Sequence, residues 1–276
     1  THYLGFNANM LANEMYLDSA DIRKNIVSLA KMIGYTPTSC RASNAELSVR
    51  VNNIPSTTTS LTMDKGTVFT TSLDGQSYQL VTNQSYTIQP TAGVFQFDNV
   101  NIFEGTLVTF KYTVDSNDVD QKFIIPSSNA DTSTLKVSIQ TSASDTTTEV
   151  YSLANSYSGL TDISKSYFLQ EGVDERYEVY FGDGVLGKKP VDGNIIILEY
   201  IVTNKTEANG ASVFTLSGDI DGFSDVTITT TSNAANGSEP QTKESIRYNA
   251  PLQYTAQDRA VTSKDYETIV KSVYAN

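Results

Sequence analysis

Between Ala45 and about Thr231, short runs of alternating apolar and polar residues recur, and turn-forming dipeptides separate them. The clearest alternating runs are residues 47–51, 94–97, 107–114 and 135–139. Alternation of this kind places one set of side chains on each face of a β-strand. Turn dipeptides such as Asp74-Gly75 keep each strand short. The pattern predicts on the order of ten or more short strands in a sandwich or barrel-like assembly, and it argues against βαβ units.

Three segments of this region carry more specific predictions. Residues 68–70 and 78–81 flank Asp74-Gly75, which predicts a two-stranded hairpin with a tight turn. Residues 195–202 are almost continuously apolar, which is typical of a strand covered on both faces. A helix would also bury such a run, but its β-branched residues favour a strand. Asn209-Gly210 is then expected to close a hairpin.

The N-terminal residues 1–35 show helical spacing instead. Asp18-Ser19 is expected to cap a second helix in this segment, Gly34 to end it, and Pro37 to prevent its continuation. The apolar stripe of that helix is formed by Ile22, Ile26, Leu29, Ala30 and Ile33. Such a stripe is buried either on the β-rich region or against another chain, and we favour another chain.

The C-terminal end carries two further helical signals. Residues 233–240 are typical of a linker, and residues 242–249 predict a short helix. Thr262 and Asp265 form a variant of the capping box, which predicts another helix. One face of that helix would carry Tyr266, Ile269, Val270 and Val273.

These signals together predict an α+β, mainly β fold. An N-terminal helical hairpin is followed by an antiparallel β-rich region and then by C-terminal helices. We divide the chain into N-terminal helices (1–40), a β-rich domain (41–232), and a linker with the start of a C-terminal helical domain (233–276). We expect the chain to be part of a longer polypeptide.

Charge and cysteine usage exclude several functional classes. The net charge is −12, and no basic run is longer than Lys188-Lys189, whereas binding to nucleic acid needs a basic stripe. No segment approaches the roughly 18 apolar residues of a membrane span. The single cysteine, Cys40, excludes an intrachain disulfide framework and favours assembly in a reducing cytoplasm. We therefore expect neither nucleic acid nor membrane as a partner.

Two loops resemble ligand-binding motifs, but both lack essential parts. Gly182 to Lys188 fits the spacing of a phosphate-binding loop, yet Lys189 stands where a Mg²⁺-binding Ser or Thr is needed, and Pro190 follows. Asp219, Asp221 and Asp225 have spacing that could collect Ca²⁺. The further oxygen ligands of a calcium loop are missing there, and Asx turns explain the aspartates equally well.

The sequence offers few candidate catalytic residues. The only histidine is His2, so a Ser–His–Asp or Cys–His centre has no well-placed general base, and zinc lacks ligands. Paired carboxylates for glycoside hydrolysis are not concentrated in any segment with aromatic platforms, and tryptophan is absent. We expect no enzyme activity, no catalytic residues, no cofactor-binding residues and no metal ligands.

Four separated segments, in order along the chain, resemble one known family. They are Tyr16–Ser39, which includes Ala20–Arg23 (ADIR) and Gly34–Ser39 (GYTPTS), then Tyr177–Gly184 (YEVYFGDG), Leu198–Asn204 with Ala208–Ala211 (LEYIVTN and ANGA), and Arg259–Tyr266 (RAVTSKDY). The ordered set is similar to the wedge subunit of T4-like phage baseplates, and the last segment is shared with baseplate J-like proteins. The strands between about residues 70 and 165 match that family only in pattern.

The resemblance implies a structural subunit of a contractile tail baseplate, located in the virion and assembled in the host cytoplasm. In this family, two copies of the subunit join a third protein of the wedge through their N-terminal helices. The C-terminal region links neighbouring wedges around the tail hub, and the ring holds the sheath until host cell entry. The implied partners are a second copy of the chain, other wedge subunits, neighbouring wedges, and hub or sheath-initiating proteins.

The resemblance also gives the helical stripes a role, since they would be interfaces with other chains. The predicted interface residues are Leu4, Met10, Leu11, Ile22, Ile26, Leu29, Ile33, Tyr266, Ile269 and Val270. An alternative function is a tail-associated carbohydrate-binding adhesin, which would present an exposed groove among the tyrosines. An ordinary extracellular sandwich shares the composition, which is rich in Thr, Ser, Asn, Val and Tyr.

Overall fold

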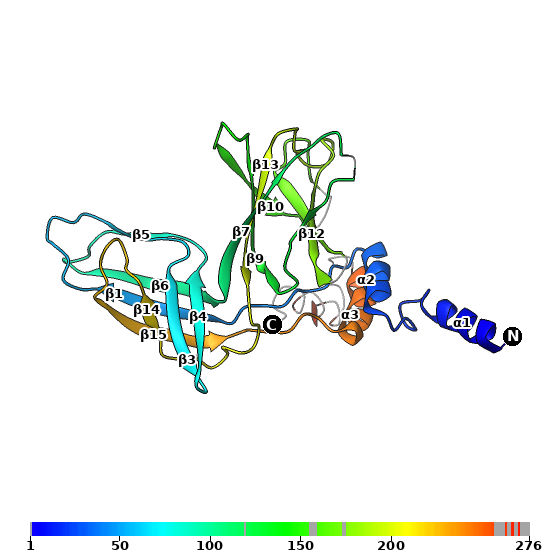
Figure 1. Cartoon of the computed structure of the whole chain (residues 1–276), viewed down its shortest axis with the longest axis horizontal. Helices are drawn as coiled ribbons and strands as arrows, with labels where there is room; N and C mark the ends of the chain where they lie inside the picture. The colour runs from blue at the N-terminus through cyan, green and yellow to red at the C-terminus, as the bar shows by residue number, and fades with distance from the viewer. Residues whose placement is uncertain are drawn as a thin grey trace.

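The computed structural model of the chain describes residues 2–118, 120–154, 159–172 and 175–256, together with positions 263, 266, 267 and 270. Two short helices, α1 (His2–Asn13) and α2 (Arg23–Met32), precede a β-rich middle, and α3 (Lys243–Ala256) follows it (Figure 1). The mainly β fold with few helices is therefore confirmed. The capping box at Thr262 and Asp265, and with it Ile269 and Val273, lies outside the described residues.

The middle of the chain forms two lobes with separate cores, and the first lobe holds the strands from both ends of the β-rich region. Its strands are β1 (Asn44–Val51), β2 (Leu61–Met63), β3 (Val68–Leu73), β4 (Gln76–Thr82), β5 (Tyr86–Ile88), β6 (Phe95–Glu104), β14 (Thr215–Ser217) and β15 (Val226–Ala235). Six of them form a sheet in the order β14-β3-β4-β6-β1-β15, and β2 pairs with β5. Every pair in this lobe is antiparallel.

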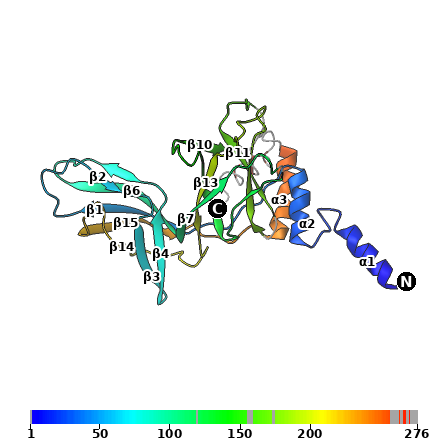
Figure 2. The same cartoon turned by 45° about the horizontal axis from the view of Figure 1, so that its top comes forward.

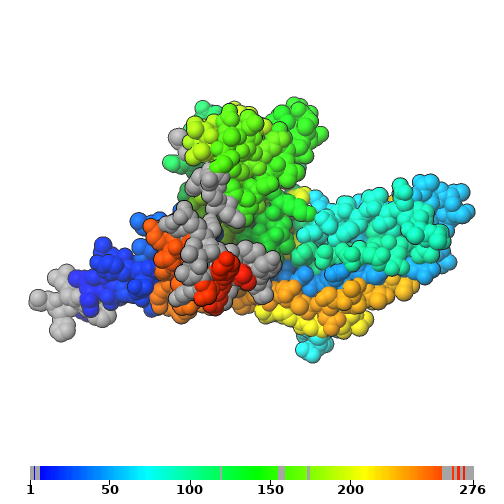
Figure 3. Space-filling model, turned by 180° about the vertical axis from the view of Figure 1, so that it is seen from behind, coloured from blue at the N-terminus to red at the C-terminus, as the bar shows by residue number. Residues whose placement is uncertain are grey.

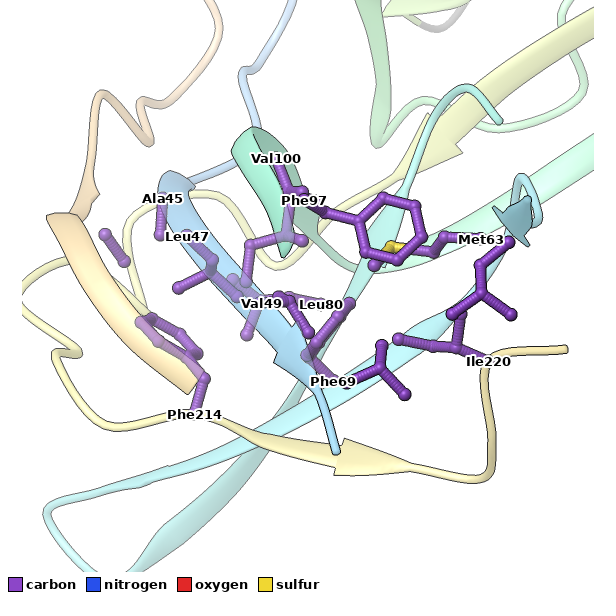
Figure 4. Close-up of a cluster of buried hydrophobic side chains, with 14 of the residues drawn as sticks. Ala45, Leu47, Val49, Met63, Phe69, Leu80, Phe97, Val100, Phe214 and Ile220 are labelled. Atoms are coloured by element: carbon purple, nitrogen blue, oxygen red, sulfur yellow. The ribbon is translucent and has the colours of Figure 1, made fainter. Parts of the chain in front are cut away.

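The alternation in β1 explains the core of the first lobe. Its odd-numbered apolar residues, Leu47 and Val49 among them, are completely buried, while the residues between them are not. Figure 4 shows these side chains converging with Phe69 of β3, Leu80 of β4 and Phe97 of β6. Burial of such side chains supplies most of the stability of a β-sandwich lobe of this size.

The second lobe is built from the strands in the middle of the sequence. They are β7 (Thr106–Thr113), β8 (Phe123–Ile124), β9 (Ala130–Gln140), β10 (Thr148–Leu153), β11 (Ser166–Glu171), β12 (Tyr177–Phe181) and β13 (Ile195–Val202). They form one sheet in the order β7-β13-β9-β10-β11-β12-β8. The sheet curls so that its two edge strands approach each other. The Tyr112 hydroxyl of β7 donates a hydrogen bond to the Ile124 carbonyl of β8, at 2.8 Å. The expected antiparallel pairing holds except between β10 and β11, which are parallel.

Two of the local strand predictions are confirmed and one is wrong. Residues 195–202 form β13, which pairs with a strand on each side and buries Leu198 and Tyr200. Asp74 and Gly75 both have positive φ, 50° and 80°, as a type I′ hairpin between β3 and β4 requires. Asn209-Gly210 closes no hairpin, because β14 pairs with β3 and the Asn209 side chain is engaged elsewhere.

The two N-terminal helices do not form the expected hairpin. Figures 1 and 2 show α1 standing clear of the molecule, while α2 lies beside α3. Ile26 and Ala30 of α2 are buried with Ile246 and Ala250 of α3. We call α2 and α3 the helix pair. Its second member is longer than the predicted helix over residues 242–249, because the helix continues through Pro251 to Ala256.

The predicted C-terminal end of α2 is confirmed, and the predicted N-terminal cap is wrong. Gly34 adopts φ 78° just after the helix, and the Tyr35 N–H donates to the Ala30 carbonyl, which is the glycine-terminated ending that the sequence predicts. Asp18-Ser19 does not cap the helix, since the N-cap residue is Ile22 and makes no side-chain capping bond. The Glu14 carboxylate accepts hydrogen bonds from the Asp21 and Ile22 N–H groups instead.

The path of the chain is nested. The second lobe is inserted between β6 and β14 of the first lobe, and the first lobe lies between the two members of the helix pair. Arg41 and Ser238 bridge in antiparallel fashion, so the segments that enter and leave the first lobe run side by side. Both the helix pair and the second lobe therefore meet the same end of the first lobe (Figure 1).

Gly105, at the crossing from the first lobe to the second, allows no side chain. Its φ is +118°, and an added Cβ would lie 2.1 Å from the Val202 carbonyl oxygen of the returning strand. Gly105→Ala is expected to lower the free energy of unfolding by about 2–4 kcal/mol, through backbone strain and displacement of that strand. Urea denaturation followed by circular dichroism measures this.

Gly75→Ala is the matched control, because Gly75 also has positive φ but open space around it. It should cost only about 1 kcal/mol of left-handed strain. Equal losses for the two variants would contradict the steric explanation.

Candidate functional site

Helix α1 presents an apolar surface that nothing in the described chain covers. Its sequence from His2 to Asn13 contains no Asp, Glu, Lys or Arg, and Gly5 lowers its intrinsic helical stability. Exposed large side chains in and just after it are Tyr3 (84%), Met10 (52%), Leu11 (68%), Met15 (70%) and Tyr16 (68%). An isolated helix of this length is marginal in water, and clustered exposed apolar side chains mark contact surfaces.

The predicted interface residues of the N-terminal segment fall into three groups. Met10, Leu11 and Ile22 are exposed. Ile26 is completely buried in the helix pair, and Leu29 and Ile33 are partly buried against it. The side chain of Leu4 lies outside the described residues. The stripe that the sequence predicts is therefore divided between the chain's own core and the surface.

The C-terminal side adds a second exposed set. Tyr248 and Tyr254 of α3 are exposed, as are Tyr266 and Val270 beyond it. Ile269 lies outside the described residues. The sequence pattern did not single out either α3 tyrosine, and Tyr254 lies beyond the helix predicted over residues 242–249.

The connection between α1 and α2 is compact. The Glu14 carboxylate accepts hydrogen bonds from the Asn25 side chain at 2.7 Å and from the Asp21 N–H at 2.9 Å. These two bonds, that of Asn25 first, hold the pKa of Glu14 below its usual range. The Ser19 hydroxyl donates to the Asn13 carbonyl at the end of α1. Glu14 thus fixes the point from which α1 projects.

A buried ion pair fastens the helix pair to the second lobe. Arg23 of α2 donates twice to the Glu171 carboxylate of β11, at 3.1 and 3.2 Å, and a third time to the Gln241 carbonyl. The Glu171 side chain is only 3% exposed. Burial raises the pKa of Glu171, and the Arg23 charge and hydrogen bonds oppose that rise. A bidentate pair of this kind fixes orientation as well as distance.

Further hydrogen bonds hold the helix pair and the segment after α2 in place. The Tyr177 hydroxyl of β12 donates to the Pro37 carbonyl at 2.9 Å, and the Thr36 hydroxyl donates to the Leu169 carbonyl at 3.2 Å. Arg247 of α3 donates to the Leu17 and Ala20 carbonyls before α2. Sequence reasoning missed Arg23, Glu171 and Gln241, because partners so far apart along the chain leave no local pattern.

We call the crossing between the lobes, residues 104–105 and 202–204, the joint, and a buried carboxylate organises it. Glu104 is 1% exposed and accepts hydrogen bonds from the Thr203 hydroxyl (2.6 Å), the Asn204 N–H (2.8 Å) and the Asn204 side-chain amide (2.9 Å). No salt bridge to Glu104 occurs within the described ranges. Its oxygens are therefore occupied by structural donors.

A second buried carboxylate, Asp131 of β9, binds the segment that enters the first lobe. Asp131 accepts from the Ala42 N–H at 2.9 Å and from the N–H and hydroxyl of Ser133. Asn209 accepts from the Ser43 hydroxyl at 2.8 Å and from the Gly237 N–H at 3.0 Å, which ties the entering and leaving segments together. These polar groups form hydrogen bonds within the chain.

The two motif-like loops are structural turns. Asp183 accepts hydrogen bonds from the Val185 and Leu186 N–H groups at 2.9 Å, and the loop leads into β13 and not into a helix. Asp219 accepts from the Gly222 N–H, whereas Asp225 accepts from the side chain of Asn53. In the part of the chain that the structure describes, no three His, Cys, Asp or Glu side chains are grouped to hold a metal ion.

A hollow lies on the surface of the second lobe. Glu149, Tyr151, Lys188 and Asn194 are among its lining residues. Glu149 is already paired with Lys188 and with Lys165. These pairs, that with Lys188 first, hold the pKa of Glu149 below its usual range, so it remains ionised and unsuited to general acid catalysis. No helix among the described residues is long and apolar enough to cross a membrane.

Comparison with known proteins gives one informative similarity. No family model matches the chain. The chain is similar to the baseplate wedge protein gp6 of Enterobacteria phage T4, with 24% identity over 301 aligned residues. The alignment takes in 100% of this chain but 44% of the relative, so the chain spans less than half of that protein's length. The similarity is a distant homology that extends over both lobes and all three helices.

The Arg23–Glu171 pair gives a first prediction for this site. Arg23→Ala leaves a buried carboxylate without its cation, and we expect the free energy of unfolding to fall by about 3–5 kcal/mol. Arg50→Ala, at an exposed position of β1, is the control and should change it by less than about 0.5 kcal/mol. Hydrogen exchange should show faster exchange in α2 and α3, with β1 unaffected. Unchanged protection of both helices would contradict the role of this pair.

Glu14 gives a pH prediction. Because the folded-state pKa of Glu14 is lowered, its contribution is present above the unfolded pKa of about 4.3 and is lost as pH falls through the folded pKa. We expect the protection factors of the Asp21 and Ile22 amides to fall between about pH 5 and pH 3. Glu14→Gln should remove this pH dependence, whereas Glu46→Gln should retain it. A persistent dependence in Glu14→Gln would show that another group titrates.

Proposed function

We propose that this chain, a distant homologue of a phage T4 baseplate wedge protein, is a structural subunit of a contractile tail baseplate. The observation that carries the proposal is the uncharged, exposed helix α1, which projects beside the helix pair. Homology over the whole chain gives that helix a setting in which other proteins surround it. The location is then the virion tail baseplate, after assembly in the host cytoplasm.

The partner surface at the N-terminus follows from which side chains remain exposed. Met10, Leu11 and Ile22 are available to another chain, with Leu4 predicted to join them. Leu29 and Ile33 are partly covered and would lie at the margin. Ile26 acts indirectly, because its burial against α3 holds the base of the surface. We propose that α1 enters a helical bundle with a second copy of the chain and another wedge subunit.

The C-terminal side is proposed to contact neighbouring wedges around the tail hub. Tyr248 and Tyr254 are exposed on α3, and Tyr266 and Val270 continue the exposed set beyond it. Tyrosine is enriched at protein interfaces, since it offers a large apolar surface with a polar end. The Arg23–Glu171 pair and the Arg247 bonds would pass force between this side, α1 and the second lobe during sheath triggering.

A non-catalytic role agrees with the use of the carboxylates. Glu104 and Asp131 are both buried, and each accepts hydrogen bonds from backbone N–H and hydroxyl groups. Neither carboxylate is therefore available to react with a substrate. The related wedge protein is itself a baseplate component. The alternative of a carbohydrate-binding adhesin has less support, because Tyr248 and Tyr254 lie on α3 and neither lines the hollow of the second lobe.

Leu11→Glu tests the proposed bundle. A charge on the exposed face of α1 would have to be buried on assembly, so we expect binding to the other wedge subunits to weaken by at least about tenfold. The fold should be unaffected, because Leu11 is exposed in the free chain. Co-expression with the candidate partner subunits, followed by light scattering on the purified complexes, measures the loss.

Ser28→Glu, at an exposed position of α2, is the matched control. It adds the same charge near the same end of the molecule and should leave assembly intact. Equal binding by the wild type and Leu11→Glu would sink the bundle proposal. Specific binding of the chain to a glycan, with no binding to any tail protein, would favour the adhesin.

A further inference from the structure

Strand β15 is a long edge strand with few of the usual protections against pairing. It runs over Val226–Ala235, and within its sheet it pairs only with β1. Residues 226–238 contain no Asp, Glu, Lys, Arg or Pro. Natural edge strands normally avoid association by being short, charged or interrupted by proline. The edge strands β14 and β8 are short, and β7 carries Lys111, so β15 differs from each of them.

The hydrogen-bond register identifies which backbone groups are free. The Asn52 N–H donates to the Asp225 carbonyl at 2.9 Å, and the register continues as Arg50 opposite Thr227. Hydrogen-bonding positions alternate along an antiparallel pair. Thr227 and Thr229 therefore direct their N–H and C=O groups at β1, and the groups of the residues between them point outward. The outward positions are Val226, Ile228 and Thr230.

Only the far end of this edge is covered. The Ala234 N–H donates to the Ala211 carbonyl, the Gly210 N–H donates to the Ala234 carbonyl, and the Thr230 hydroxyl donates to the Ser212 carbonyl. Among the described residues, no backbone hydrogen bond reaches the outward N–H and C=O groups of Val226, Ile228 or Thr230, since the bond of Thr230 to Ser212 uses its side chain. Figure 3 shows β15 as an orange strip along the surface of the first lobe. A short ladder of donors and acceptors is thus left open to solvent.

We propose that this edge pairs with β15 of a second copy of the chain, antiparallel, with Ile228 opposite Ile228. In that two-fold register Val226 lies opposite Thr230, so outward groups meet outward groups on both strands. The solvent-side threonines also match, because Thr227 faces Thr229 and such pairs stabilise sheets. The proposal does not depend on the proposed function.

The charge distribution restricts where two copies of the chain can meet. Two molecules of net charge −12 repel each other, and contact is least costly through a strip that bears no charge. Residues 226–238 form such a strip, and the two-fold arrangement pairs it with itself. The paired area is smaller than the roughly 1,200–2,000 Å² of a stable interface, so the association of free chains is weak and concentration-dependent.

Cysteine cross-linking tests the register. Ile228→Cys puts two thiols opposite each other in the paired state, within the reach of a disulfide. The native Cys40 is completely buried and does not interfere. Val150→Cys, an exposed position on the second lobe, is the matched control. Mild oxidation should give covalent dimers of Ile228→Cys that increase with concentration, and none of Val150→Cys. Failure of Ile228→Cys to exceed the control overturns the proposal.

Introduced negative charges test the same contact without covalent cross-linking. The double substitution Thr227→Glu and Thr229→Glu puts carboxylates opposite one another across the pair, while both positions are exposed in the free chain. Sedimentation velocity at increasing concentration should show at least a tenfold loss of self-association, partly restored by 0.5 M salt, with Ser152→Glu as the control.

The Leu11→Glu background separates this contact from α1. Self-association that survives Leu11→Glu but is lost in the Thr227→Glu, Thr229→Glu variant supports pairing through β15. Self-association lost only with Leu11→Glu, or a chain that stays monomeric throughout, overturns it. Binding of an unrelated extended peptide to β15 without self-association would overturn the choice of a second copy as the occupant.

Discussion

The antiparallel contact between the segments that enter and leave the first lobe determines where every other part of the molecule lies. Arg41 bridges to Ser238, and Asn209 binds Ser43 and Gly237 across the same place. An added Cβ at Gly237 would lie 2.2 Å from the Lys205 carbonyl oxygen, so three segments meet there at backbone distance. Because both ends of the first lobe leave side by side, α2 and α3 emerge together and become partners.

Two kinds of buried charge hold this arrangement, and they act differently. Among the described residues, the donors to Glu104 at the joint are neutral, and they fix the geometry of the crossing through short local bonds. Glu171 instead meets the Arg23 guanidinium from a distant element, so it fastens one body to another. Removing a neutral donor leaves a polar group short of one bond, whereas removing the cation leaves an uncompensated charge. Loss of Arg23 is thus expected to cost more than loss of one donor to Glu104.

The sequence predicts those features whose cause is local. Residues 195–202 form a doubly covered strand because the run is apolar and rich in β-branched residues, and Asp74-Gly75 makes its hairpin because both residues tolerate positive φ. Asn209-Gly210 has the same local chemistry, but the Asn209 amide forms bonds to distant segments instead. Local turn preference is weaker than several tertiary hydrogen bonds to a buried site.

The candidate contact surface was also predicted only in part from the sequence. The periodic stripe from Ile22 to Ile33 correctly marks a helix that needs a partner, yet periodicity says nothing about which partner. The structure supplies Ile246 and Ala250 for Ile26, from the other end of the chain. Glu14 was missed as the group that bonds the start of α2, because it lies before the turn and not at the N-cap position.

The uncharged parts of an acidic molecule then set how it can assemble. Helix α1 and the free edge of β15 both lack charge, and they lie toward opposite ends of the long axis (Figure 1). A two-fold contact through β15 is closed and joins two chains only, so growth beyond a pair needs a second, different surface. Helix α1 is such a surface, and Glu14 just after it is bonded to Asn25 of α2 and to the Asp21 N–H. Two contacts of different symmetry on one rigid body build a larger assembly without open-ended polymerisation, provided that α1 binds a bundle of fixed size.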